Sequence, residues 1–188
     1  MRQLVARQLG RVPEIGFEVA VKCSNGWPVI LRNLPKTSSG YPHPNLYYLS
    51  CPWLRRELAR LEDAGVIGKL QEQLSSDKEL FSDLMRAQQK YSDECRRSRR
   101  DSATVRNIAG EKAVPEDADV FIAGARKPAL LKCLHAHMAY YLVHDGYLLG
   151  LRIVSVLTAM ECSDNRCSTW AAEIREGGSM TGERQGAS

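Results

Sequence analysis

The sequence lacks the features that would place the chain in a membrane or on a secretory route. No apolar run reaches the roughly 20 residues that a transmembrane helix needs. The first ten residues include Arg2 and Arg7 and two glutamines, and this composition is too polar for a signal peptide. We therefore expect a cytoplasmic protein that does not use a membrane as a partner.

The short motifs that often reveal a reaction are also missing. The sequence has no glycine-rich phosphate loop, no His-Glu-x-x-His zinc motif and no paired-carboxylate signature. It contains no internal repeat and no Cys-x2-Cys pair, since the closest cysteines are Cys162 and Cys167. Motifs therefore assign no reaction, and the placement of cysteine and histidine is the main chemical signal.

What the chain does contain is ordinary for a folded soluble protein. Of its 188 residues, 44% are hydrophobic and 26% are charged, as in typical globular domains. A net charge of +4 is a mild basic excess, which by itself does not imply a nucleic-acid partner. We expect one globular domain over residues 9–176 and a disordered tail over 177–188.

The N-terminal part has the pattern of a β-hairpin. Residues 17–23 alternate and are rich in β-branched side chains, and residues 27–32 form a second such run. Ser24-Asn25-Gly26 between them is a strong turn signal. An isolated hairpin is only marginally stable, so we expect this one to pack on the rest of the domain.

Most of the remaining chain has helical periodicity. Leu54, Leu58 and Leu61 recur at helical spacing after Pro52, and a longer helix is expected from about residue 78 to 95. Two apolar stretches, 129–145 and 148–160, predict buried helices. The polar span 98–126 predicts a flexible loop, with a short strand at 120–123. The expected fold is α+β, mostly helical, with the hairpin packed on a helical core.

The predicted helix at 129–145 carries three of the four histidines. At 100° per residue, Cys133, His137, Tyr140 and His144 fall on one narrow stripe, whereas His135 lies away from Cys133. If the stretch were a strand instead, the side chains at 133, 135 and 137 would share a face. The run of alanine and leucine favours the helix.

These side chains suggest a metal site. Thiolates and imidazoles are the ligands of structural zinc and of iron–sulfur clusters. Cys23 ends a strand and Cys51 precedes a helix, so both stand where backbone ends can converge. The hypothesis is a zinc ion or an iron–sulfur cluster held by Cys23, Cys51, Cys133 and His137, with Cys162 and Cys167 as substitute ligands. The alternative is that these cysteines are small core residues.

Two other functions fit the same sequence. A thiol enzyme would use Cys133 as nucleophile and His137 as base, with His144 or Tyr140 orienting the base. A nucleic-acid-binding adaptor would neutralise phosphates with a basic run that follows the long helix. That run consists of Arg96, Arg97, Arg99, Arg100 and Arg106.

Five short motifs of the chain together support a resemblance to a known family. They are Leu9-Gly-Arg-x-Pro13, Val19-Ala-Val-Lys-Cys23, Tyr47-Tyr-Leu-x-Cys-Pro52, Leu61-Glu-x-x-Gly-Val66 and Lys132-Cys-Leu-His-Ala-His137. Over about residues 9 to 175 the chain resembles the DUF501 family, bacterial proteins of unknown function. The resemblance implies a bacterial, cytosolic, single-domain protein and brings no known activity.

Overall fold

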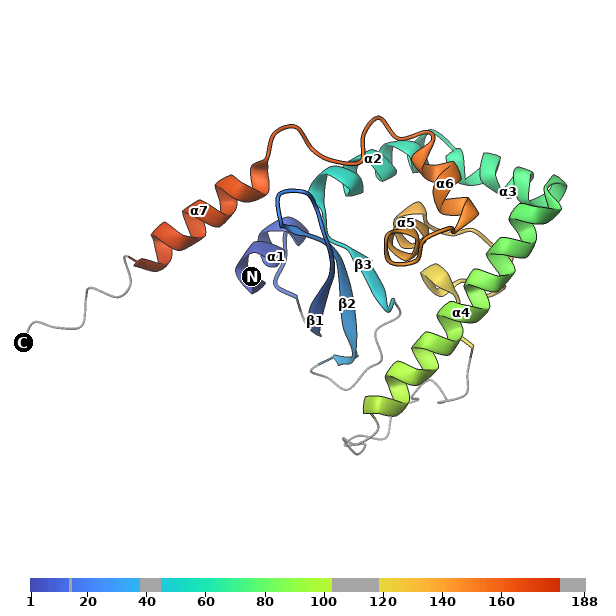
Figure 1. Cartoon of the computed structure of the whole chain (residues 1–188), viewed down its shortest axis with the longest axis horizontal. Coiled ribbons are helices and arrows are strands. Elements are labelled where there is room, and N and C mark those ends of the chain that lie inside the picture. The colour runs from blue at the N-terminus through green and yellow to red at the C-terminus, as the bar shows by residue number, and fades with distance from the viewer. Residues whose placement is uncertain (14, 38–44, 103–118, 180–188) are drawn as a thin grey trace, which may run out of the picture.

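The computed structural model of the chain describes residues 1–13, 15–37, 45–102 and 119–179 (Figure 1). These residues form seven α-helices, one short 3-10 helix and three strands. In chain order the elements are α1 (Arg2–Leu9), β1 (Ile15–Lys22), β2 (Pro28–Thr37), β3 (Tyr47–Leu49), α2 (Pro52–Asp63), α3 (Val66–Ser76), α4 (Lys78–Ser102), η1 (Ile122–Gly124), α5 (Leu134–Val143), α6 (Leu148–Val154) and α7 (Arg166–Ser179). The predicted class, α+β and mostly helical with a sheet packed on helices, is confirmed.

The three strands form one antiparallel sheet in the order β1-β2-β3. The predicted hairpin is present, and the Cys23 N–H donates to the Trp27 carbonyl at 2.9 Å to close its turn. Gly26 in that turn has a φ of 80°, in the left-handed region that favours glycine. The third strand, Tyr47–Leu49, pairs with β2 and widens the hairpin into a sheet.

Helix α5 lies at the centre of the molecule, between the sheet and the other helices (Figure 1). It contacts β3, α2, α6 and η1. Leu134, Met138 and Ala139 of this helix have no exposed surface. A helix that is apolar on most of its circumference is stable only when it is enclosed in this way. The sheet, α2, α6 and η1 are therefore arranged around α5, whereas α7 packs on α1 (Figure 1).

The central helix is shorter than the sequence predicts, because α5 begins at Leu134 rather than near residue 129. The preceding segment bonds to a side chain instead of to itself. Gln71 of α3 donates to the Ala129 carbonyl at 3.0 Å and accepts the Leu131 N–H at 2.9 Å. With both groups satisfied from another helix, this segment reaches α5 without forming helical turns.

The structure also differs from the expected loop at 98–126, at both ends of that range. Helix α4 continues through Ser102, seven residues beyond the predicted end at Cys95. The strand expected at 120–123 is absent from the described chain, and the 3-10 helix η1 stands there instead. Gln88 of α4 accepts the Ile122 N–H at 2.8 Å and so ties η1 to α4. The rest of that expected loop, residues 103–118, lies outside the described residues.

Three further boundaries differ from expectation. Helix α1 precedes the predicted start of the domain, and its residues Leu4 and Val5 are buried. Helix α6 ends at Val154, well before residue 160. Helix α7 runs to Ser179, past the predicted start of the tail, and residues 180–188 lie outside the described residues. Over the parts of the chain that are described, no helix has both the length and the apolar character needed to cross a bilayer.

Two helical glycines predict opposite effects of alanine substitution. A Cβ on Gly150 of α6 would lie 2.3 Å from Cγ of Tyr141 on α5, so Gly150→Ala must push the two helices apart. Such overpacking costs about 1–3 kcal/mol. A Cβ on Gly68 of α3 would meet nothing within 4 Å, and Gly68→Ala should stabilise the fold by about 0.5–1 kcal/mol. Urea unfolding measures both changes, and effects of the same sign would contradict the close approach of α5 and α6.

Candidate metal centre

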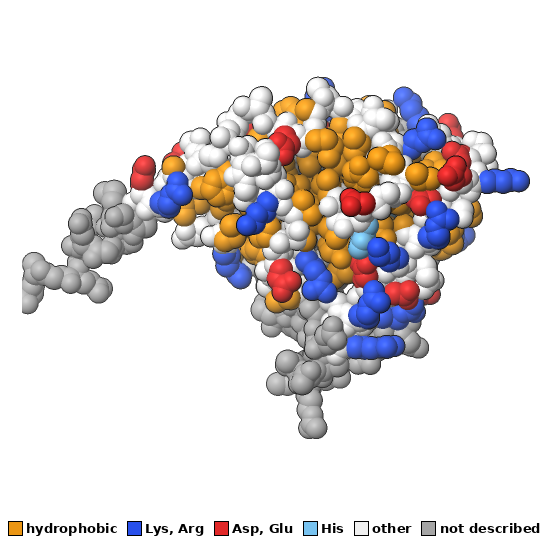
Figure 2. All heavy atoms as spheres, viewed as in Figure 1, with side chains coloured by type: hydrophobic (Ala, Val, Ile, Leu, Met, Phe, Trp, Pro, Cys, Tyr) orange, Lys and Arg blue, Asp and Glu red, His pale blue; other side chains and the backbone are white. Residues whose placement is uncertain are grey.

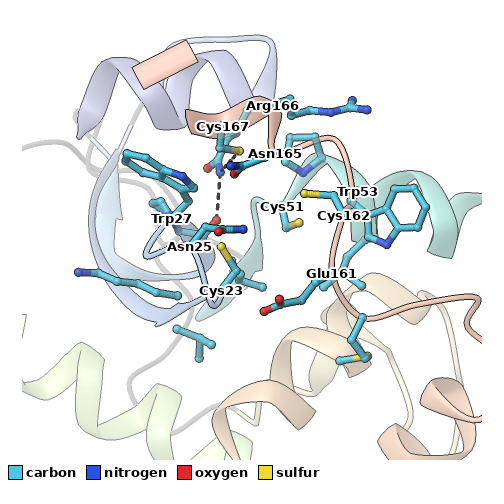
Figure 3. Close-up of a pocket in the computed structure, with 18 of the residues that line it drawn as sticks. Cys23, Asn25, Trp27, Cys51, Trp53, Glu161, Cys162, Asn165, Arg166 and Cys167 are labelled. Carbon is cyan, nitrogen blue, oxygen red and sulfur yellow. Dashed lines mark hydrogen bonds between the residues drawn. The ribbon is translucent and has the colours of Figure 1, made fainter. Parts of the chain in front are cut away.

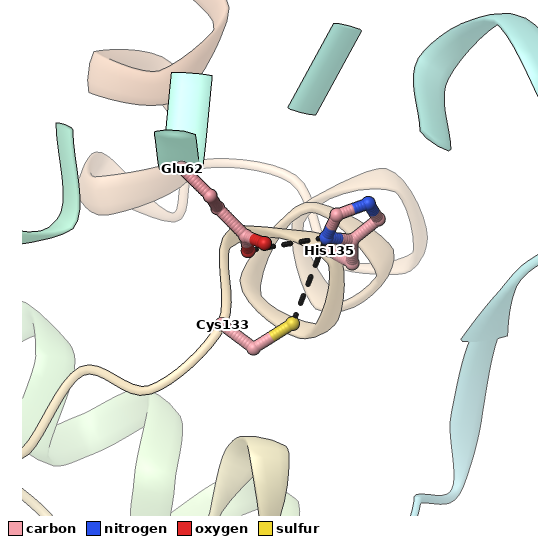
Figure 4. A group of neighbouring side chains, drawn as sticks. All are labelled: Glu62, Cys133 and His135. Carbon is pink, nitrogen blue, oxygen red and sulfur yellow. Dashed lines mark hydrogen bonds and ion pairs between the residues drawn. The ribbon is translucent and has the colours of Figure 1, made fainter. Parts of the chain in front are cut away.

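The structure divides the four residues of the predicted metal site between separate places. Cys23 and Cys51 line a pocket beside the hairpin turn (Figure 3). Cys133 stands at the start of α5, beside Glu62 and His135 (Figure 4). In the described part of the chain, this last trio is the one group whose three ligand atoms all lie within 4.8 Å of one another. The predicted combination of Cys23, Cys51, Cys133 and His137 is therefore not assembled.

His137 is a core residue in this structure. Its side chain has no exposed surface, and its Nδ1 lies 2.8 Å from the Tyr147 hydroxyl. Burial lowers the pKa of His137 to about 4, so the ring is neutral at neutral pH. Its link to Cys133 is a backbone bond, from the His137 N–H to the Cys133 carbonyl at 3.4 Å. The thiol of Cys133 contacts His135 instead, so the predicted nucleophile and base are not paired.

The trio beside α5 brings three kinds of ligand atom to one point (Figure 4). Glu62 stands in the last turn of α2, Cys133 is the N-cap of α5, and His135 lies in the first turn of α5. Nδ1 of His135 is 3.1 Å from Oε1 of Glu62 and 3.7 Å from Sγ of Cys133. An oxygen and a sulfur thus approach the same ring nitrogen.

Glu62 is fixed in place by the start of α5. Its Oε1 accepts the Leu134 N–H at 2.6 Å, and Cys133 itself makes no side-chain capping bond. The first N–H groups of a helix have no partners within it, and they favour a negative charge nearby. The carboxylate of α2 therefore caps α5, and the cap holds it beside Cys133 and His135.

The contact of Nε2, the other ring nitrogen of His135, determines which nitrogen carries the hydrogen. Nε2 lies 2.9 Å from the carbonyl oxygen of Arg55. Because a carbonyl can only accept, Nε2 carries the hydrogen and donates it. Nδ1 is then the nitrogen that can accept a proton or bind a metal. Histidines that bind metals in proteins commonly donate their other N–H to a backbone carbonyl in this way.

The surroundings of His135 favour its charged form when no metal is bound. Burial alone lowers the pKa of His135, but the contacts with Cys133, the Arg55 carbonyl and Glu62 outweigh it and raise that pKa to about 9. The side chains of His135 and Glu62 are 26% and 25% exposed. The site is therefore an ion pair that solvent and small ions can reach.

Sequence periodicity missed His135 and Glu62 for a physical reason. The predicted helix includes Cys133, and helical geometry places His135 on a different face from Cys133. Cys133 is in fact extended, with a φ of −156°, so the angular rule of the helix does not reach it. The strand alternative, in which side chains at 133 and 135 share a face, gives the better local picture. Glu62 is separated from Cys133 by 71 positions, and no local pattern links the two.

The arginine run extends along the last turns of α4. Arg96, its first member, donates to Asp93 and to Asp119, the latter at 3.0 Å. On the face shown in Figure 2, lysine and arginine side chains alternate with aspartate and glutamate. Arg97, Arg99 and Arg100 follow on the same helix, and Arg106 lies outside the described residues. A nucleic-acid partner stays a prediction.

Comparison with known families shows which family the chain belongs to. The model of a family described as "Protein of unknown function (DUF501)" matches residues 19–152. The chain belongs to the DUF501 family. The matched span of this DUF501 protein contains Cys23, Cys51 and the whole trio beside α5, whereas Cys162 and Cys167 lie beyond it. No curated protein and no solved structure matches the chain.

The ion pair of this DUF501 protein predicts a pH dependence of stability. An unfolded histidine has a pKa of about 6.5, and that of His135 is raised to about 9. Because folding favours the protonated ring, the stabilisation is complete below about pH 6.5 and is lost as the pH rises through 9. Glu62→Gln removes the carboxylate, so the pKa of His135 should fall. NMR titration of the imidazole in chelator-treated protein measures this pKa.

A matched control is present in the same protein. His144 Nε2 lies 3.2 Å from Oε2 of Glu94, a second histidine–glutamate pair at the other end of α5. Glu94→Gln should leave the pKa of His135 unchanged. If Glu62→Gln left it unchanged as well, Glu62 would not be the partner that keeps His135 charged.

Proposed function

We propose that this protein binds a divalent transition-metal ion, with zinc as the first candidate, through Glu62, Cys133 and His135. The observation that carries the proposal is the convergence of an oxygen, a sulfur and a nitrogen at the start of α5, all within 4.8 Å of one another. Zinc accepts each of these atoms, from carboxylate, thiolate and neutral imidazole. This proposal keeps Cys133 from the sequence hypothesis and replaces the other three residues.

The observed separations are close to those that zinc requires. With bonds of about 2.3 Å to sulfur and about 2.0–2.1 Å to nitrogen or oxygen, tetrahedral geometry places the sulfur about 3.6 Å and the oxygen about 3.3 Å from the nitrogen. The corresponding distances from His135 Nδ1 are 3.7 Å to Cys133 and 3.1 Å to Glu62. Binding would therefore need only small movements of these side chains.

The same geometry argues against a Cys–His relay. In a nucleophilic triad, the nucleophile and the carboxylate lie on opposite ring nitrogens of the histidine, so that one proton is taken and the other is held. Here the thiol and the carboxylate both approach Nδ1, and a backbone carbonyl occupies Nε2. This arrangement supports coordination better than proton relay, although both would use Cys133.

Three protein ligands leave one tetrahedral position of zinc for another group. Catalytic zinc sites have this composition, with water or substrate in the fourth position, whereas structural sites are closed by four protein ligands. The partial exposure of Glu62 and His135 supports access of water to the ion. A bound water would become a stronger acid there.

The bacterial origin and cytoplasmic location stay predictions from the sequence.

Metal binding must remove the proton from Nδ1 of His135. The raised pKa of His135, about 9, means that a proton competes with the ion at neutral pH. We therefore expect zinc affinity to rise between pH 6.5 and pH 8.5, in contrast to the ion-pair stabilisation, which falls over the upper part of this range. Calorimetric titration with zinc chloride at the two pH values measures the change.

Variants test the ligands directly. The titration uses chelator-treated protein carrying Cys162→Ser, so that the separate cysteine pocket does not contribute. One zinc ion per chain is expected. Adding Cys133→Ser or His135→Gln should weaken binding by at least about a hundredfold, because even the loss of a residue that only orients a ligand can cost up to this much. His144→Gln, which alters the histidine–glutamate pair without a thiol, should leave the affinity unchanged. Equal binding by all these variants would overturn the proposal.

A further inference from the structure

Four of the six cysteines line one pocket, and none of them belongs to the trio beside α5 (Figure 3). Cys23 lies at the hairpin turn, and Cys51 is the N-cap of α2. Cys162 lies in the segment that precedes α7, and Cys167 lies in the first turn of α7. The cavity between them measures about 110 Å³. Residues from three distant parts of the sequence are thus brought together around one space.

The segment that supplies Cys162 and Cys167 is held against the hairpin and α2 by side-chain bonds. Glu161 accepts the Ser24 N–H at 2.8 Å. The indole of Trp27 donates to Ser168 at 2.8 Å, and that of Trp53 donates to the Ala159 carbonyl at 3.1 Å. Trp27 and Trp53 lie on opposite sides of the pocket (Figure 3). Side-chain bonds therefore hold the elements around the pocket together.

The thiols are spaced too widely for a single zinc ion. A zinc ion bound by four thiolates at about 2.3 Å places neighbouring sulfurs about 3.8 Å apart. In the described structure, no three of the pocket's sulfurs lie within 4.8 Å of one another. The cavity of about 110 Å³ also exceeds the roughly 10–15 Å³ that a single water molecule needs by this measure. A centre made of several atoms could bridge thiols that a single ion cannot reach together.

One of the sulfurs receives a side-chain hydrogen bond, and a second is influenced by nearby backbone donors. The backbone N–H groups of Trp53 and Leu54, in the first turn of α2, lower the pKa of Cys51, although its burial raises it more. The side-chain amide of Gln8 donates to Sγ of Cys167 at 3.3 Å. Hydrogen bonds to cysteine sulfur stabilise thiolates, and they help to set the potential of iron–sulfur clusters.

Burial disfavours the charged form of two of the four thiols. Burial is the main factor that raises the pKa of Cys51 and of Cys167, and charge on neighbouring thiols raises both further. Much of the lining is apolar and includes Val21, Val29, Leu54, Leu142 and Met160. A positively charged centre would offset the cost of burying charged thiolates. A thiol that binds a metal loses its proton outright.

We propose that this pocket binds an iron–sulfur cluster through the thiolates of Cys23, Cys51, Cys162 and Cys167. Iron–sulfur clusters are typically held by four cysteine thiolates. Loading from a synthetic cluster that carries small thiolate ligands is a ligand exchange without electron transfer. Each cysteine thiol gives its proton to the departing thiolate, one iron–sulfur bond breaks, and one forms to the cysteine. This site shares no ligand with the zinc site.

The test uses the full chain, purified without oxygen, freed of metal and incubated with a synthetic four-iron cluster whose ligands are 2-mercaptoethanol thiolates. After gel filtration we expect about four irons per chain, with an equal amount of sulfide and visible thiolate-to-iron absorption. Cys162→Ser, at a half-exposed position outside any helix, should lose most of the iron and the absorption. A circular dichroism spectrum equal to that of the unaltered protein would show that this variant is folded.

The control is Cys133→Ser, which should keep the cluster and lose zinc binding at the trio. Cys162→Ser should show the reverse. This reciprocal pattern separates the two proposals, since each can fail while the other stands. Iron retained equally by Cys162→Ser, no iron retained by the unaltered protein, or one zinc ion bound by the four pocket thiols in place of iron would overturn the cluster proposal.

Discussion

The carboxylate of Glu62 at the N-terminus of α5 is the contact on which both the fold and the candidate metal site depend. It satisfies the Leu134 N–H and faces His135 at the same time. The first N–H groups of a helix have no partners within it and need partners from elsewhere in the protein. One side chain thus caps the central helix and is also the oxygen ligand of the proposed metal site.

Helix α2 connects the two candidate sites. Cys51 stands at its N-cap position and lines the cysteine pocket, and Glu62 stands in its last turn beside Cys133. Its 12 residues span about 18 Å at 1.5 Å per residue. The same helix supplies the Arg55 carbonyl that orients His135. A rigid helix therefore fixes both the distance between the sites and the orientation of one ligand in each.

The sequence predicts the parts of this structure that depend on local patterns. The hairpin at Ser24-Asn25-Gly26 and the helix after Pro52 follow from turn chemistry and periodicity, and both are present. The start of α5 does not follow, because Gln71 provides the bonds that keep the preceding segment out of the helix. Which cysteines meet depends on tertiary packing, which periodicity does not contain.

X-ray absorption at the zinc edge, on chelator-treated protein reloaded with one equivalent of zinc, tests the central claim most directly. The account predicts a zinc ion with one sulfur ligand at about 2.3 Å and the remaining ligands nitrogen or oxygen at about 2.0–2.2 Å. That result would place zinc with Glu62, Cys133 and His135. A shell of four sulfurs would place zinc in the cysteine pocket, and a shell without sulfur would remove Cys133 from the site. Either of these two results would contradict the account.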